Sequence, residues 1–398
     1  MMKYAERMDR LGTETAFRVL AQIQDFPEER RNNVISFAIG EPDFDTPDHI
    51  KQAGIEAIEN DRTHYTPSAG TPELRQAIAD TVGKQKNINI GPENVCVLPS
   101  AKFIINLSIA TCTDPGDEVI YPNPGYPIYE SQINVHGCKA IPAPLVEEED
   151  FGFDIDRLRS LVNDKTTMII LNNPNNPCGS VLSNTQLEAL RELALQHDLW
   201  ILADEIYSNL VYDNLNFHSI AELPDMQSRT IILDGFSKFF AMTGWRLGYA
   251  ISNPTIIDYF ARWATNTVSC TATFVQDAGV AAMTEPMDPS WAMVRQFERR
   301  RDLICELIND IEGMHVNPPK GAFYVFANVT EACKKKGFKD SLEFQNRLLD
   351  EEDVALLARD FFGHKSPDET QEYIRFSYCV SEEDIKEGLA RIKKFVEG

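Results

Sequence analysis

One lysine and one arginine at a fixed spacing are the residues of this chain best suited to chemistry. Lys238 precedes Arg246 by eight residues, in the run SKFFAMTGWRLGY at residues 237–249. A lysine amine attacks an aldehyde once burial or a neighbouring positive charge has lowered its ammonium pKa. Arg246 can supply that charge and grip a phosphate with its forked donors. The pair therefore predicts a site that holds a phosphorylated aldehyde on Lys238.

The same run resembles the lysine signature of the class I/II aminotransferases, which are fold-type I enzymes that depend on pyridoxal phosphate and include the aspartate and aromatic aminotransferases. The resemblance implies that Lys238 forms a Schiff base with this cofactor. It also implies that Lys238, once released by the substrate, moves the proton from the substrate Cα. Ser237 and Arg246 are then expected to bind the cofactor phosphate.

A second motif, DEIY at residues 204–207, follows an apolar run that ends at Ala203. A carboxylate paired with a pyridine nitrogen keeps that nitrogen protonated, so the ring can take up the electrons left when Cα loses its proton. We assign this role to Asp204. The motif resembles the family's D-E-x-Y, which implies that Tyr207 donates a hydrogen bond to the phenolate oxygen of the cofactor.

A turn rich in asparagine and proline, NNPNNPCG at residues 172–179, follows another apolar run. Prolines and a glycine stiffen such a turn, so it can aim one side-chain amide. It resembles the family's N-P-x-N-P-x-G, which implies that Asn176 bonds the same phenolate oxygen and lies beside the substrate. Cys178 stands where the family commonly has threonine, and we expect this to change turn packing more than chemistry.

Two further segments are expected at the cofactor. Tyr126, in NPGYP at residues 123–127, matches the aromatic residue that stacks on the cofactor ring in the family. Ser100, Ala101 and Lys102 follow an apolar run and are expected to open a helix whose first backbone N–H groups bind phosphate. The family usually has glycine where Ser100 stands.

The remaining expectations concern the substrate and a partner subunit. Arg375 lies in an otherwise apolar strand, IRFS, where a buried charge needs a partner. The resemblance implies that Arg375 grips the substrate α-carboxylate as a fork and that the backbone of Gly40 approaches the same group. It also implies that Tyr65 reaches the phosphate of the neighbouring subunit, so we expect a homodimer with shared active sites.

These residues together predict an aminotransferase that moves an amino group from an L-amino acid to a 2-oxo acid. Lys102 lies where some relatives that use aspartate place a lysine, so an acidic amino acid with 2-oxoglutarate is the first expectation, and aromatic amino acids are the next. A solvated lysine at a helix start is the alternative interpretation of Lys102.

Other function classes remain open at this point. A lyase that cleaves a carbon–sulfur bond or eliminates a side-chain group shares the fold and the Schiff-base chemistry. A non-catalytic regulator that binds the cofactor is a remote alternative, because no spare DNA-binding segment or basic patch is visible. A nicotinamide-dependent oxidoreductase is disfavoured because the first strand is not followed by G-x-G-x-x-G.

The elements that must position these residues are strands and helices in alternation. Apolar runs predict strands over six ranges, and helix-like segments such as 183–197, with Ser183 as N-cap, lie between them. The predicted strands are 95–98, 118–121, 168–171, 200–203, 230–233 and 247–251. This pattern predicts an α/β protein with a mostly parallel, doubly wound sheet, and ligands bind at the carboxyl ends of such strands.

We expect a large cofactor-binding domain over residues 49–290 and a smaller α+β domain over residues 291–398. The assignment of residues 1–48 to the smaller domain comes from the resemblance. A chain of 398 residues is long enough for two domains.

Composition excludes several partners. The net charge of −23 repels nucleic acid and anionic membrane surfaces, so we expect neither as a partner. The eight cysteines and seven histidines show no zinc-ligand spacing, so we predict no metal site. Scattered cysteines, with no export signal and no apolar run long enough for a membrane span, predict a soluble cytoplasmic protein.

Overall fold

The computed structural model describes residues 2–12, 16–367 and 369–398 of the chain. Its centre is an eight-stranded sheet with the strand order β2, β9, β8, β7, β6, β3, β4, β5. The strands are β2 (Val95–Leu98), β3 (Glu118–Asn123), β4 (Lys139–Val146), β5 (Gly152–Phe153), β6 (Thr166–Asn172), β7 (Trp200–Asp204), β8 (Thr230–Gly235) and β9 (Gly248–Ile251). The six strands predicted from apolar runs all form, and the predicted α/β class is confirmed.

The sheet is parallel in its middle and antiparallel at its edges. Strands β4, β3, β6, β7 and β8 run parallel to one another, whereas β5 is antiparallel to β4 and β9 is antiparallel to both β8 and β2. The parallel strands β6 and β7 are almost wholly buried, as strands covered on both faces must be. Their carboxyl ends at Asn172 and Asp204 are paired, so the motifs that follow them begin side by side.

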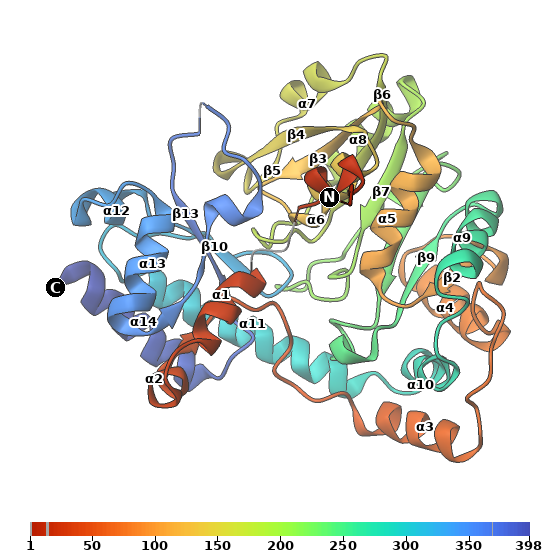
Figure 1. The fold of residues 1–398 in the computed structure, drawn as a ribbon, viewed down its shortest axis with the longest axis horizontal. Coiled ribbons are helices and arrows are strands. Elements are labelled where there is room, and N and C mark those ends of the chain that lie inside the picture. Colours follow the sequence, from red (N-terminus) through yellow and green to blue (C-terminus); the bar gives the residue numbers. More distant parts are fainter. Residues whose placement is uncertain (1, 13–15, 368) are drawn as a thin grey trace.

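Helices cover both faces of this sheet (Figure 1). Side chains that alternate along each strand pack against α5 (Ala101–Cys112), α6 (Ile128–Val135) and α9 (Pro254–Thr267) on one face, and against α7 (Ile155–Leu161), α8 (Asn184–Gln196) and α4 (Pro72–Gln85) on the other. Ser183 is the N-cap of α8, as predicted, and its side chain forms a capping box with that of Gln186.

The chain after residue 287 forms a smaller arrangement of helices around a short sheet. Strands β10 (Tyr324–Asn328), β13 (Tyr373–Ser377) and β12 (Leu357–Ala358) are antiparallel. Around them lie α11 (Asp288–Asn309), α12 (Thr330–Lys336), α13 (Ser341–Glu352) and α14 (Glu382–Glu397). Strand β1 (Ile35–Ser36) pairs with β11 (Val354–Ala355), and α1 (Ala16–Gln24) shares a hydrophobic cluster with α13 and β11. Helix α2 (Glu28–Asn33) is joined to α14, because Arg391 Nη1 donates to the carbonyl of Asn33 at 2.9 Å. The expected domain boundaries, at residues 48/49 and 290/291, remain a prediction.

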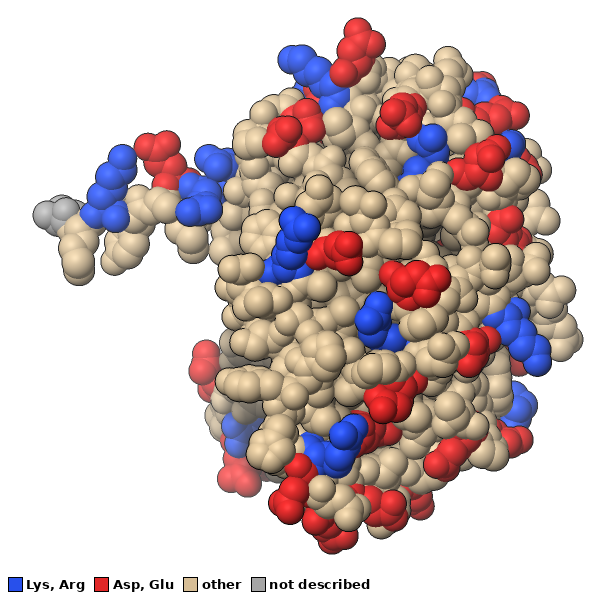
Figure 2. Space-filling model, turned by 90° about the vertical axis from the view of Figure 1, so that its right-hand side faces the viewer, with Lys and Arg blue, Asp and Glu red and all other residues tan. Residues whose placement is uncertain are grey.

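The first described residues lie against a helix that covers the large sheet. The 3-10 helix η1 (Glu6–Arg10) contacts α6, where Arg10 Nε donates to the carbonyl of Asn134 at 2.9 Å and the amide of Gly12 donates to Ser131 Oγ at 3.0 Å. Figure 2 shows these residues as an arm that extends from the body of the molecule. Within the described ranges, no helix is both long and apolar enough to cross a membrane.

Candidate active site

A cavity of about 460 Å³ lies between the central sheet and the C-terminal part of the chain. Its walls come from segments that are far apart in sequence. All the predicted site residues except Tyr65 line it: Gly40, Ser100, Ala101, Lys102, Tyr126, Asn176, Asp204, Tyr207, Ser237, Lys238, Arg246 and Arg375. Tyr65 lies outside this lining, with 90% of its side chain exposed.

Asp204 ends β7 and is buried on the floor of the cavity. Its Oδ2 accepts a hydrogen bond of 2.6 Å from the Tyr129 hydroxyl, and its Oδ1 accepts one of 3.3 Å from the amide of Ile206. Burial raises the pKa of Asp204 to about 7; these two donors oppose the rise, and the carboxylates of Asp234 and Glu205 add to it. A carboxyl that gives up its proton near neutral pH is suited to sharing a proton with a ring nitrogen.

Lys238 lies in the turn between β8 and β9, opposite Gly40. Its Nζ donates to the Gly40 carbonyl at 2.6 Å and lies 5.5 Å from the ring centre of Phe323 and 6.0 Å from that of Tyr207. A Cβ on Gly40 would overlap the hydroxyl of Tyr324, so a side chain there would push this ring aside. The amine is therefore held at the cavity wall by a backbone carbonyl and aromatic faces.

An anion-binding corner forms where α5 begins. Ser100 caps the helix: its hydroxyl accepts from the Lys102 amide at 3.2 Å and from Arg246 Nη2 at 2.6 Å. Ser100 has φ 105°, in the region that favours glycine, which is the residue the family usually has there. Gly248 allows the close approach, because a Cβ at that position would overlap the backbone at Ala101. A helix N-terminus, hydroxyls and a guanidinium make this corner suitable for a phosphate.

Arg375 enters the cavity from β13, with 4% of the residue exposed. Its Nη1 donates to Asn176 Oδ1 at 3.1 Å and its Nη2 to the carbonyl of Ala38. Its guanidinium lies 4.5 Å from the ring centre of Tyr324 and 5.0 Å from that of Phe362. The guanidinium lines the cavity, where it can meet an anion that enters.

The asparagine turn is fixed to the end of β7. Asn172 Oδ1 accepts from the Asn176 amide at 2.7 Å, and Asn172 Nδ2 donates to the Asp204 carbonyl at 3.3 Å. Asn176 is buried between this turn and Arg375. The turn therefore places an amide side chain between the sheet and the arginine of β13.

A buried arginine joins the turn that carries Tyr126 to the C-terminal part. Arg359 is fully buried and donates to Asn123 Oδ1 at 3.0 Å and to the carbonyl of Gly363 at 3.0 Å. It also pairs with Glu369, at 2.5 Å and 2.8 Å. The amide of Gly125 donates to the carbonyl of Phe362 at 2.9 Å. We refer to Arg359, Asn123 and Glu369 as the Arg359 clasp.

Sequence reasoning missed two tyrosines of the site. The Tyr324 hydroxyl lies 2.9 Å from that of Tyr207, and Tyr129 bonds Asp204. Tyr129 lies three residues after Tyr126, in the first turn of α6, and their rings contact edge to face at 5.7 Å, so its closeness in sequence was a usable signal. Tyr324 begins the strand that pairs with β13, and only that pairing brings it to Arg375.

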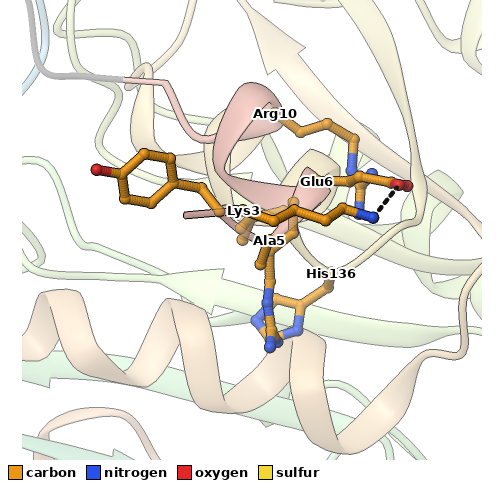
Figure 3. A pocket seen from close by; sticks show the side chains of 8 residues that line it. Lys3, Ala5, Glu6, Arg10 and His136 are labelled. Carbon is orange, nitrogen blue, oxygen red and sulfur yellow. Dashed lines mark ion pairs between the residues drawn. The ribbon is translucent and has the colours of Figure 1, made fainter. Parts of the chain in front are cut away.

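A second hollow of about 670 Å³ lies between η1 and α6 (Figure 3). It is lined by Lys3, Tyr4, Ala5, Glu6, Arg7, Arg10, Val135 and His136. Lys3 and Glu6 pair there at 3.6 Å, and both side chains are exposed. It is larger than the first cavity but contains no predicted site residue, so we place the chemistry in the first. Among the described residues, no group of three or more His, Cys, Asp or Glu side chains could hold a metal ion.

The donor set of the first cavity fits pyridoxal phosphate. Lys238 offers an amine for the aldehyde, Asp204 offers a carboxylate for the ring nitrogen, and the corner at Ser100 and Arg246 offers donors for the phosphate. An aldehyde reacts with an amine, a basic ring nitrogen pairs with a carboxyl group, and a phosphate dianion accepts hydrogen bonds, so each part of the cofactor has a matching group here.

Comparisons with known proteins agree with this fit. Residues 32–392 match the model of the family described as aminotransferase class I and II. The chain is 38% identical to an aspartate aminotransferase of Pyrococcus abyssi and 37% identical to aromatic-amino-acid aminotransferase 2 of Thermococcus litoralis, over 91% of each chain in both cases. It superposes on the crystal structure of the aspartate aminotransferase from Rhizobium meliloti with a TM-score of 0.93 and 31% identity, over 100% of this chain and 99% of that one.

Proposed function

This chain belongs to the class I and II aminotransferase family, and from that premise we propose that it takes the amino group of an acidic L-amino acid, aspartate first, and passes it to a 2-oxo acid such as 2-oxoglutarate. The protein is an aminotransferase that depends on pyridoxal phosphate, with amino acids and 2-oxo acids as substrates. The observation that carries the proposal is the convergence of Lys238, Asp204 and Arg375 on one cavity.

When bound, pyridoxal phosphate supplies an aldehyde carbon that links to amines and a protonated ring that takes up the electrons of a broken Cα–H bond. Lys238 would hold it through Nζ, Asp204 would hold the proton on the ring nitrogen, and Tyr126 would stack on the ring. Tyr207 and Asn176 would donate hydrogen bonds to its phenolate oxygen. Its phosphate would be held by Arg246, by the hydroxyls of Ser237 and Ser100 and by the first amides of α5, at Ala101 and Lys102.

The roles proposed for the substrate side follow from charge and reach. Arg375 would grip the α-carboxylate with two parallel N–H donors, beside the backbone of Gly40. This grip orients the substrate so that its Cα–H bond faces Lys238. Lys238 Nζ, once free, would take the proton from Cα, because it lines the cavity that the substrate enters.

The preference for an acidic substrate rests on Lys102. Its Nζ lies 5.6 Å from the ring centre of Tyr126, at the wall where a substrate side chain would extend. An ammonium at that place favours a distal carboxylate over an alanine methyl group or an uncharged ring. Relatives of this chain carry both aspartate and aromatic names, so an aromatic amino acid is the competing donor.

Half-reactions test the proposal. The purified protein with bound cofactor is mixed with aspartate, glutamate, alanine or phenylalanine, and the change in cofactor absorption and the released 2-oxo acid are both measured. We expect the fastest change with aspartate, with oxaloacetate as the product. A response to phenylalanine alone would overturn the acidic preference. Pyruvate and ammonia without a second oxo acid would indicate a lyase.

The proposal includes a homodimer. Tyr65 is 90% exposed, and α9 exposes the rings of Tyr259 and Trp263. The loop after Tyr65 meets α9 through a hydrogen bond of 2.8 Å between Thr265 Oγ1 and Ser68 Oγ. Exposed aromatic rings of this kind are typical of surfaces that bind a second chain. On this proposal, Tyr65 completes the phosphate corner of the neighbouring subunit.

We also propose the domain division into residues 49–290 and residues 1–48 with 291–398, supported by the separate short sheet of β10, β12 and β13 and by the pairing of β1 with β11. Within residues 1–48, η1 is the exception, because it contacts α6 of the large domain. A cytoplasmic location is proposed because all eight cysteines are free thiols, which reducing compartments preserve.

A further inference from the structure

A buried ionic cluster lies directly behind Asp204 and Lys238. Lys86 follows the last turn of α4, and its Nζ donates to Glu205 Oε2 at 2.8 Å and to Ser208 Oγ at 2.9 Å. The same nitrogen lies 3.3 Å from Asp234 Oδ2. The three charged side chains are between 3% and 7% exposed. The proposed reaction gives none of them a role.

The two carboxylates belong to neighbouring strands that carry the site. Glu205 directly follows Asp204 at the end of β7, and Asp234 lies four residues before Lys238 at the end of β8. These strands are paired, with Asp204 opposite Leu233. One ammonium therefore bridges the end of β7, which carries Asp204, and the end of β8, which leads into the turn that carries Lys238.

The other contacts of the cluster do not replace the bridge. Ser219 Oγ donates to Glu205 Oε1 at 2.6 Å, and the amide of Gly235 donates to Asp234 Oδ1 at 2.7 Å. Burial lowers the pKa of the Lys86 ammonium, but Glu205 and Asp234 outweigh it and raise that pKa, so the ammonium is charged. Without the ammonium, two buried carboxylates would face each other and repel.

We propose, on the basis of the proposed function, that Lys86 is a positioning residue of the cofactor site: by binding Glu205 and Asp234 together, it fixes the spacing between Asp204 and Lys238. The cofactor is held at opposite ends by these two residues, so its affinity and its orientation depend on that spacing. Lys86 itself does not reach the cavity lining.

Four proteins test this role: the wild type, Lys86→Met, the double variant Lys86→Met/Glu205→Gln, and Lys84→Met. Lys84 is an exposed lysine on the same helix and serves as the matched control. The double variant breaks the bridge without leaving two carboxylates against each other. Each protein is stripped of cofactor and titrated with pyridoxal phosphate. Its dissociation constant, the induced circular dichroism of the bound cofactor and the unfolding temperature of the stripped protein are measured.

We expect Lys86→Met to lower the unfolding temperature and to raise the dissociation constant by about tenfold or more. The double variant should regain much of the lost unfolding temperature. Its dissociation constant for pyridoxal phosphate should stay raised, and the induced circular dichroism of each bound cofactor should stay weakened. Lys84→Met should match the wild type.

Wild-type affinity and signal in the double variant would overturn the inference, because Lys86 would then only balance charge. The double variant decides the question even if Lys86→Met does not fold. Failure of the wild type to bind the cofactor would instead count against the proposed function.

Discussion

The Tyr129 hydroxyl donates a hydrogen bond of 2.6 Å to Asp204 Oδ2, and both side chains are buried. Tyr129 lies on α6 and Asp204 at the end of β7, so the bond joins a helix that covers the sheet to the centre of the cavity. A donor favours the ionised carboxylate, whereas burial favours the protonated acid. Their balance leaves the pKa of Asp204 at about 7.

Asp204 should make the stability of the cofactor-free protein depend on pH. A carboxyl whose pKa rises from 3.8 to about 7 on folding contributes stability that is fully present below pH 3.8 and is lost as the pH rises to about 7. The loss is on the order of 4 kcal/mol. The free energy of unfolding, measured with urea between pH 5 and 8, should therefore fall as the pH rises. Asp204→Asn should flatten this fall, and Tyr129→Phe should extend it to higher pH. An unchanged slope in Asp204→Asn would contradict the raised pKa.

Lys238→Ala should remove the covalent bond to the cofactor and the base that takes the Cα proton. We expect the visible absorption of the bound cofactor to change to that of the free aldehyde and turnover to fall by about 10²- to 10⁴-fold or more. Absorption spectra and steady-state rates check this, with Lys84→Ala as the exposed control. Full activity in Lys238→Ala would discard the mechanism.

Arg375→Lys should weaken the binding of the amino-acid substrate and leave the binding of the cofactor nearly unchanged. The lysine keeps the charge but loses the fork that matches a carboxylate. We expect KM for the amino acid to rise by about 10- to 100-fold, with cofactor affinity within a factor of about two of the wild type. Arg347→Lys, on the exposed face of α13, is the control. Equal KM values in Arg375→Lys and wild type would remove Arg375 from the substrate site.

Tyr324 should act in two separable ways. Tyr324→Phe removes the hydroxyl that bonds Tyr207 but keeps the ring beneath Arg375, whereas Tyr324→Leu removes both. We expect the Leu variant to raise KM by a further factor of about 2 to 30 over the Phe variant, because it also loses the cation–π contact. The KM values of the two variants, measured side by side, give this factor. Identical values would show that the ring contributes nothing.

Tyr65 should act in the neighbouring subunit. If so, mixing Tyr65→Ala chains with Lys238→Ala chains creates dimers in which one site has both native residues. After random exchange of subunits, about a quarter of all sites should be native. The measurement is activity before and after mixing under conditions that exchange subunits. No recovery, with exchange shown independently, would place Tyr65 outside the partner's site.

Much of the cavity could be predicted because its residues follow apolar strands. Asp204, Asn176 and Lys238 each come just after a buried run, and the ends of adjacent parallel strands lie at one edge of a sheet. The corner at Ser100 was predictable for the same reason, although the conformation of Ser100 was not. The backbone there has a positive φ, which only coordinates reveal.

The residues that escaped prediction act through packing between distant segments. Tyr324 meets Arg375 only because β10 pairs with β13, and Lys86 meets Glu205 across 119 residues of sequence. From the sequence, a lone lysine at a helix end such as Lys86 is expected to be solvated, because nothing nearby in sequence indicates that two carboxylates enclose it. Long-range partners of this kind are fixed by the fold and leave no local pattern.

The Arg359 clasp ties the C-terminal part of the chain to the central sheet at a buried point. Asn123 belongs to the sheet, Glu369 to the C-terminal part, and the guanidinium between them is sealed from solvent. Breaking such a buried ion pair costs about 3–5 kcal/mol, so the guanidinium is held in place. The turn that carries Tyr126 is therefore anchored to the C-terminal part at a point outside the cavity lining.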